Sequence, residues 1–238
     1  MSDQETKTKE DRFVHLHLHS EYSLLDGAIR LRDLPRRLKE LGMTSCALTD
    51  HGVMYGLVDF YQMMVKEGLK PILGCEVYVA PEGMLIKEGP EARRMNHLVL
   101  LCENQEGLKN LNHILTAANI QGFYYKPQVD HALLKKHSEG IIALSACLSG
   151  EIPEAILAGN MSKAKETIKL YQEIFGKDNF FLEVQENGIP DQQKVNIALK
   201  QLSAEMDAPL VATNDCHYLM QEDWLTHDIL LCMQTGRK

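Results

Sequence analysis

The sequence has 238 residues, a formal net charge of -8 and 45% hydrophobic residues. These values fit one large globular domain or two small ones and exclude a disordered or collagen-like chain. No apolar run approaches the roughly 20 residues that cross a bilayer, and the N-terminus lacks the apolar core of a secretory signal. We therefore predict a cytoplasmic protein. The acidic balance argues against a broad basic surface for nucleic acid, but not against a site where metal ions act on phosphates.

In chain order, a flexible polar tail is predicted over residues 1–11, and residues 12–238 are predicted to form a single domain. Beyond the tail, short β-prone runs alternate with helical patterns. The predicted strands cover residues 13–19, 44–50, 72–80, 97–103, 141–147, 179–186 and 209–219. The predicted helices cover residues 31–42, 56–68, 107–119, two stretches between 151 and 175, 191–206 and 222–235.

This alternation predicts an α/β fold. Strands separated by helices of ten or more residues favour parallel pairing through right-handed crossovers, in either a closed barrel or an open doubly wound sheet. The chain contains neither G-x-G-x-x-G nor G-x-x-x-x-G-K-S/T, the usual phosphate-binding loops of the open sheets. We therefore favour the barrel, in which chemistry takes place at the C-terminal ends of the strands.

Three histidines of the first predicted strand share one face. His15, His17 and His19 alternate with Leu16 and Leu18, and side chains along a strand alternate between its two faces. A single strand histidine is more often structural than a metal ligand. Several packed together leave ring nitrogens that need a cation or an acid. This pattern therefore indicates a metal site.

Further donor residues lie at or near other strand ends. Glu76 places a carboxylate in an apolar strand, where burial is costly unless a cation pairs with it. His51 lies at the exit of the second strand, and Asp215 and His217 share one face of the last strand. These donors meet those of the first strand only if the first and last strands are neighbours, as they are in a closed barrel.

The cysteines indicate no zinc finger and no disulfide framework, because the chain has six of them and no Cys-x-x-Cys pair. Cys147, at the end of the fifth strand, is either a soft metal ligand that would favour zinc over magnesium or a small buried hydrophobe. Both interpretations stay open. We expect four histidines in helices or loops to be solvated or to cap helices: His113, His131, His137 and His227.

Six segments carry a resemblance to a known family: HLHLHSEYSLLDG, ALTDHGVMYGLVDFY, KPILGCEVYVA, NHLVLL, LSACLSGEI and VATNDCHYL. From about residue 12 to residue 238 the chain resembles the PHP (polymerase and histidinol phosphatase) domain. It is similar in particular to the PHP domains at the N-terminus of bacterial DNA polymerase III alpha subunits. The resemblance implies a distorted seven-stranded (β/α) barrel with up to three metals at its C-terminal rim.

The resemblance also implies two or three divalent metals (zinc, manganese or iron) and nine ligands. These are His17, His19, Glu76 and Asp215 for the first metal; Glu76 again with His97 and Cys147 for the second; and Asp26, His51 and His217 for the third. The four ligands of the first metal are the expected catalytic residues. His97 begins its predicted strand, so a regular parallel barrel would place it at the opposite rim. His15 stands outside this set, and we expect it to line the barrel floor.

The implied reaction is metal-assisted phosphoester hydrolysis, with the 3′ end of DNA as substrate and 3′-to-5′ proofreading as outcome. Two alternatives stay open: a phosphatase acting on a small monoester such as histidinol phosphate, and an inactive scaffold that binds a separate proofreading exonuclease subunit. The full set of ligand-type residues favours retained activity. The expected partners include the remaining domains of an alpha subunit, because the chain stops at residue 238 just past a predicted helix and lacks the polymerase active site.

Overall fold

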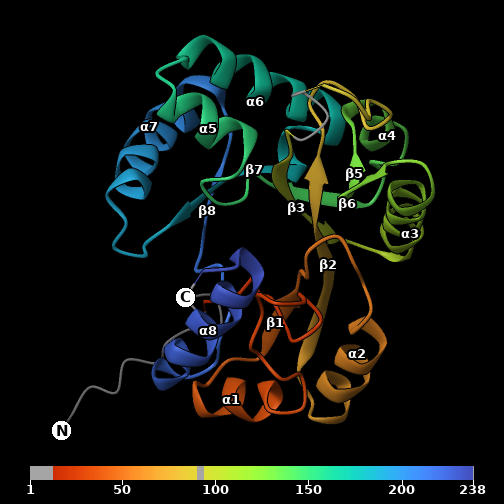
Figure 1. The fold of residues 1–238 in the computed structure, drawn as a ribbon, viewed down its shortest axis with the longest axis vertical. Coiled ribbons are helices and arrows are strands. Elements are labelled where there is room, and N and C mark those ends of the chain that lie inside the picture. The colour runs from red at the N-terminus through yellow and green to blue at the C-terminus, as the bar shows by residue number, and fades with distance from the viewer. Residues whose placement is uncertain (1–12, 90–93, 238) are drawn as a thin grey trace, which may run out of the picture.

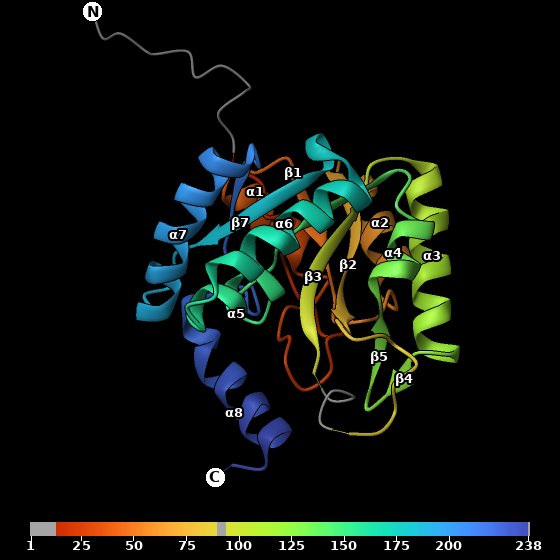
Figure 2. The same cartoon turned by 90° about the horizontal axis from the view of Figure 1, so that it is seen from above.

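The computed structural model describes residues 13–89 and 94–237, so the predicted tail over residues 1–11 lies outside the described residues. Helices surround a strongly curled β-sheet (Figure 1, Figure 2). The strands are β1 (Ser45–Leu48), β2 (Lys70–Val79), β3 (Asn96–Cys102), β4 (Phe123–Tyr124), β5 (Lys126–Val129), β6 (Ile141–Leu144), β7 (Phe180–Gln185) and β8 (Leu210–Thr213). The helices are α1 (Leu34–Glu40), α2 (Leu57–Lys66), α3 (Gln105–Ile120), α4 (His131–Lys136), α5 (Glu151–Leu157), α6 (Met161–Phe175), α7 (Pro190–Met206) and α8 (Trp224–Thr235), with 3-10 turns η2 (Lys177–Asn179) and η3 (Gln221–Asp223).

The predicted α/β barrel is confirmed in a distorted form, and its sheet is mixed. β2 pairs in parallel with β1 and β5, and β6, β7 and β8 also pair in parallel. β3, however, is antiparallel to both β2 and β6. The prediction of parallel pairing is therefore wrong for β3. β3 runs antiparallel to β2 because of the connection between them. A parallel partner needs a crossover, usually a helix, and the described part of residues 80–95 contains no helix.

The predicted first strand is not a regular strand. Within residues 13–20, His15 forms an isolated bridge with Cys46 of β1, and Leu18 forms one with Cys216, which follows β8. The segment therefore joins the two ends of the curled sheet. The prediction that the first and last segments are neighbours is confirmed, although single bridges rather than a continuous ladder join them.

The segment between α3 and β6 holds elements that the sequence analysis did not predict, namely β4, β5 and α4. They have two, four and six residues, which is too short for a periodic pattern to be read. Side chains cap the N-termini of three helices. Asn104, Asp130 and Asn160 precede α3, α4 and α6, and each side chain accepts a hydrogen bond from the N–H three residues on.

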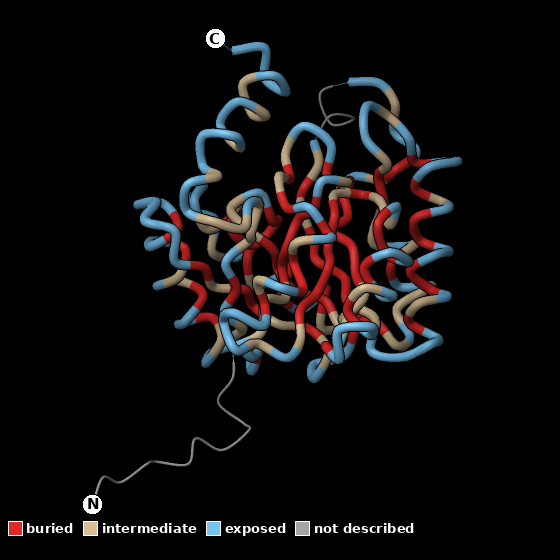
Figure 3. Tube along the Cα trace, turned by 90° about the horizontal axis from the view of Figure 1, so that it is seen from below, coloured by how far each residue is buried: buried red, intermediate tan, exposed pale blue. Residues whose placement is uncertain are grey.

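The core lies between the sheet and its outer helices (Figure 3). In β3, Leu98 and Leu100 pack with Leu111 and Ile114 of α3. The alternate residues Val99 and Leu101 belong to a separate cluster inside the barrel, with Leu144 and Ala47. Both faces of the strand are therefore apolar, as expected for a strand buried on both sides. Among the described helices, none has the length and apolar character needed to cross a membrane.

We predict that Leu100→Ala lowers the free energy of unfolding by about 2–5 kcal/mol, because the side chain is fully buried and its removal leaves a cavity against α3. Urea denaturation followed by circular dichroism measures this change. Val58→Ala on α2 is the control, since Val58 is 65% exposed and should change the value by no more than about 0.5 kcal/mol. Equal midpoints for Leu100→Ala and wild type would contradict this description of the core.

Candidate metal centre

Glu76 lies at the centre of the rim where the predicted ligands meet. This β2 carboxylate is 1% exposed. Its Oε1 lies 3.2 Å from His17 Nε2 and 3.0 Å from His97 Nδ1, and its Oε2 lies 2.5 Å from His51 Nδ1. Imidazoles from three separate segments thus converge on one buried carboxylate.

The four residues expected at the first metal are brought together. Asp215 Oδ1 lies 3.2 Å from both His17 Nε2 and His19 Nε2. His19 Nε2 also lies 3.7 Å from Glu76 Oε2. Two imidazoles and two carboxylates from the first segment, β2 and the chain after β8 therefore face one another. The predicted last strand over 209–219 is too long, because β8 ends at Thr213 and Asp215 has a left-handed backbone.

His97 reaches the same rim because β3 is antiparallel. The start of an antiparallel strand lies beside the C-terminal ends of its neighbours, and His97 pairs with Tyr78 near the end of β2. The expectation of the opposite rim is wrong for this reason. Cys147 Sγ lies 3.7 Å from His97 Nδ1, so the two residues expected to share the second metal with Glu76 are adjacent.

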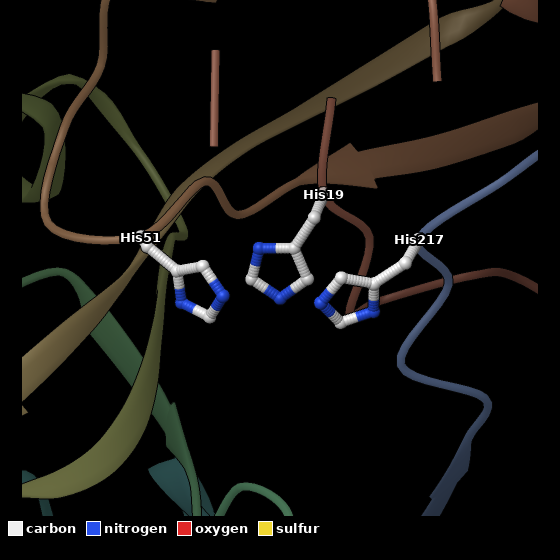
Figure 4. A group of neighbouring side chains, drawn as sticks. All are labelled: His19, His51 and His217. Atoms are coloured by element: carbon white, nitrogen blue, oxygen red, sulfur yellow. The ribbon is translucent and has the colours of Figure 1, made fainter. Parts of the chain in front are cut away.

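The third expected group also assembles. Asp26 Oδ2 lies 2.8 Å from His51 Nε2, and Asp26 Oδ1 lies 3.5 Å from His217 Nε2. Figure 4 shows His19 between His51 and His217, with ring centroids 4.0 Å and 4.4 Å away. The rings thus form a row in which nitrogen atoms of neighbouring side chains face a common space.

Three non-glycine residues at this rim adopt left-handed backbone conformations. Leu25 (φ 62°) directly precedes Asp26, Ala146 (φ 61°) directly precedes Cys147, and Asp215 has φ 50°. Such conformations cost about 1–3 kcal/mol each and persist where the surrounding structure holds them in place. They lie at or directly before three proposed ligands. This location indicates that the fold accepts backbone strain in order to direct these side chains toward the centre.

Outer hydrogen bonds orient the histidines. His17 Nδ1 lies 2.7 Å from Glu183 Oε1, and His19 Nδ1 lies 3.1 Å from Ser23 Oγ. His217 Nδ1 contacts a backbone carbonyl at 2.9 Å. With Nδ1 held by an outer acceptor, Nε2 is the nitrogen of each ring that would bind a metal, once any proton on it is displaced, which is the usual arrangement of metal-binding histidines.

The donor set fits divalent metal ions. Within the described residues, these buried atoms form close ion-pair contacts with one another but no hydrogen bond of good geometry: His17 Nε2, His19 Nε2, His51 Nδ1, both carboxylate oxygens of Glu76, and Asp215 Oδ1. Leaving a buried polar atom unpaired costs about 1–3 kcal/mol. Here such atoms face one another, so a cation between them would satisfy several at once. Imidazole with carboxylate suits zinc, manganese and iron.

The pKa values of the histidines follow from burial and nearby charge. Burial lowers the pKa of His17, but the charges of three carboxylates, led by Asp215, outweigh it and hold the pKa well above its usual value. For His51, Glu76 similarly outweighs burial and raises the pKa to about 9. Burial and the charge of His51 lower the pKa of His19 to about 3.

The acidic groups are shifted in the opposite direction to what burial alone would cause. Burial would raise the pKa of Glu76, but the neighbouring imidazoles, His97 first, hold it well below its usual value. Asp26 and Asp215 also have lowered pKa values, because histidine contacts outweigh burial. Burial and the charge of Glu76 raise the pKa of Cys147 to about 12, so its thiol is protonated at neutral pH before any metal binds.

Sequence reasoning missed two side chains at this rim. Glu183 of β7 is buried, and its Oε1 also accepts hydrogen bonds from Gln185 Nε2 at 2.9 Å and from the Thr213 hydroxyl. A carboxylate in an apolar strand was the signal that identified Glu76, and it is equally present for Glu183. The expectation that His227 is solvated or capping is wrong, because its Nε2 is buried and lies 3.7 Å from Asp26 Oδ1.

The other histidines lie outside the cluster. His113 and His137 stack on each other at 5.3 Å, and His131 Nε2 lies 2.9 Å from a carboxylate oxygen of Glu151. His15 Nδ1 lies 3.4 Å from Cys216 Sγ and takes no part in the centre.

We predict that Glu183→Gln weakens metal binding about 10–100-fold, because the carboxylate fixes the tautomer of His17 and raises its basicity. Isothermal titration of the metal-stripped chain with Zn²⁺ measures the affinity. Glu186→Gln is the matched control, since Glu186 is an exposed carboxylate just past the same strand. Unchanged affinity in Glu183→Gln would show that the outer hydrogen bond does not support the centre.

Metal should raise the melting temperature more at pH 8.5 than at pH 6. The pKa of His51 is about 9 in the folded chain, against about 6.5 unfolded, so its carboxylate pairs stabilise the metal-free fold fully below pH 6.5. This stabilisation is lost as the pH rises toward 9. At low pH, metal must also displace protons from the ligands. Thermal melts with and without a chelator at both pH values measure the difference, and a larger increment at pH 6 would contradict it.

The sequence of this chain is similar to a known domain family and to known bacterial proteins. A family model described as PHP domain matches residues 15–187. The DNA polymerase III subunit alpha of Treponema pallidum is 48% identical over 226 residues, which cover 94% of this chain and 19% of that protein. The corresponding subunit of Borreliella burgdorferi is 44% identical over 228 residues, which cover 95% of this chain and 20% of that protein. The chain thus spans about a fifth of the length of these relatives.

Two solved structures share the fold at low sequence identity. An amidohydrolase from Chromobacterium violaceum superposes with a TM-score of 0.53 at 14% identity, covering 91% of this chain and 96% of that one. A protein from Bifidobacterium adolescentis, described provisionally as a metal-dependent phosphoesterase, gives 0.51 at 13% identity, covering 86% and 87%. The match of the family model over most of the described residues decides the assignment: the chain belongs to the PHP domain family.

Proposed function

We propose that this chain is the N-terminal PHP domain of a bacterial DNA polymerase III alpha subunit and that it hydrolyses phosphodiester bonds at the 3′ end of DNA. The observation that carries the proposal is the convergence of buried imidazole and carboxylate atoms around Glu76, several of which form no hydrogen bond of good geometry. Such a donor set holds metals that act on phosphates. The remaining domains of the alpha subunit are the proposed partners, and a cytoplasmic location stays a prediction.

Each residue of the site has a distinct proposed role. One ion would be held by His17, His19, Glu76 and Asp215. Glu76 would also be shared with a second ion held by His97 and Cys147, and a third ion would be held by Asp26, His51 and His217. Bound divalent metals would supply Lewis-acid activation of water and stabilisation of charge at phosphorus. Glu183 keeps the His17 ring in the orientation in which Nε2 is the donor.

Exposed aromatic and cationic side chains that lie near the ligands in the sequence or in space support an oligonucleotide substrate. Tyr218, which follows His217, is 38% exposed, and Tyr55, four residues after His51, is 67% exposed. Lys126 Nζ lies 5.4 Å from the ring centre of Tyr78, and that ring contacts His97 edge-on. Aromatic faces stack bases, and lysine contacts backbone phosphates, so this rim suits the end of a strand better than a small monoester.

We predict that the metal-loaded chain releases mononucleotides from the 3′ end of single-stranded DNA and that Asp215→Asn lowers the rate at least about 100-fold. The reason is that Asp215 Oδ1 faces two ligand imidazoles. The control is Asp207→Asn, because Asp207 has nearly the same backbone conformation (φ 51°) but lies at the C-cap of α7. Labelled oligonucleotides resolved on a denaturing gel give the rates.

A second assay, which measures inorganic phosphate released from histidinol phosphate by the same metal-loaded chain, separates the alternatives. Hydrolysis of histidinol phosphate without release of nucleotides would contradict the proposal and support a small-molecule phosphatase. A metal-loaded chain that hydrolyses neither substrate would support the inactive scaffold that binds a separate proofreading exonuclease.

A further inference from the structure

We propose that His227 of α8 is a further ligand of the metal held by Asp26 and His217, and that this bond fixes α8 on the rim. The proposal rests on the metal centre that the proposed function requires, but not on the reaction or on DNA. It adds a donor from a helix that lies outside the barrel and that carries none of the nine ligands expected from the sequence.

The distances match shared coordination. Asp26 Oδ1 lies 3.5 Å from His217 Nε2 and 3.7 Å from His227 Nε2, and the three donor atoms all lie within 4.8 Å of one another. Ligand atoms about 2.1 Å from a tetrahedral ion are roughly 3.4 Å apart. The spacing is therefore close to that of one coordination sphere, whereas 3.7 Å is too long for a direct hydrogen bond.

The His227 ring packs beside residues of this metal group. Its centroid lies 5.3 Å from that of His217 and 5.5 Å from that of Tyr218. Its Nε2 is buried and has no hydrogen-bond partner within the described residues. A buried ring nitrogen that lies 3.7 Å from a carboxylate oxygen without bonding it needs another partner, and a cation shared with Asp26 would supply one.

Few buried contacts attach α8 to the rest of the fold. None of its residues is buried, and the helix extends away from the body of the fold (Figures 2 and 3). Its apolar residues Trp224, Leu225, Ile229 and Met233 are each more than half exposed. A metal bond through His227 would therefore be a large part of the attachment of this helix, and occupancy of the site would change how firmly it is docked.

Trp224 makes this measurable, because it is the single tryptophan of the chain and lies three residues before His227. The experiment titrates the metal-stripped 238-residue chain with Zn²⁺ while tryptophan emission and binding heats are recorded. We expect the wild type to show an emission change that saturates with one class of site. His227→Ala should weaken that class at least about 10-fold and remove the emission change, leaving the other sites intact.

His113→Ala is the matched control, since it removes an exposed histidine from α3, away from the rim, and should titrate as wild type does. Far-ultraviolet circular dichroism establishes that each variant is folded. Unchanged affinity and emission in His227→Ala would overturn the inference while leaving the metal centre in place. Absence of Zn²⁺ binding in the wild type would overturn the inference and the metal centre together, whereas metal binding without DNA hydrolysis would count against the proposed function alone.

Discussion

A fully buried carboxylate surrounded by imidazoles is the constraint on which this rim depends. Taking Glu76 out of water costs several kcal/mol unless opposite charge is placed beside it. The fold supplies His17, His51 and His97 for that purpose, each within 3.2 Å of one of its oxygens. These imidazoles are in turn oriented from outside, as His17 is by Glu183. The centre therefore needs long-range partners in addition to its own ligands.

The topology follows from the same need. The bridges of residues 13–20 to β1 and to the chain after β8 bring His17 and His19 beside Asp215. The antiparallel direction of β3 places its first residues, rather than its last, at the C-terminal rim. Closure of the sheet and reversal of β3 together assemble donors that are up to 200 residues apart in the sequence. Without the reversal, a parallel β3 would place His97 at the opposite end of the barrel.

Sequence reasoning identified the alternating fold and the donors inside or at the ends of apolar strands, because those donors are a local signal: His17, His19, His51, Glu76, Asp215 and His217. Asp26, His97 and the metal-binding interpretation of Cys147 entered the ligand set through the resemblance to the PHP family. Glu183 carries the same signal and could have been found. The direction of β3 could not, since it depends on the strand partners and the connection from β2 rather than on residues 97–103 themselves. His227 was out of reach for a similar reason, because nothing in a helical pattern says which neighbour that helix faces.

The most direct test of the account is a crystal structure of the metal-loaded chain with anomalous scattering recorded at the edge of the metal used. The account predicts anomalous peaks within about 2.0–2.6 Å of the Glu76 oxygens and of the Nε2 atoms of His17 and His19. Crystals grown at saturating metal that show these side chains ordered, with no anomalous peak among them, would contradict the claim that this rim is a metal centre.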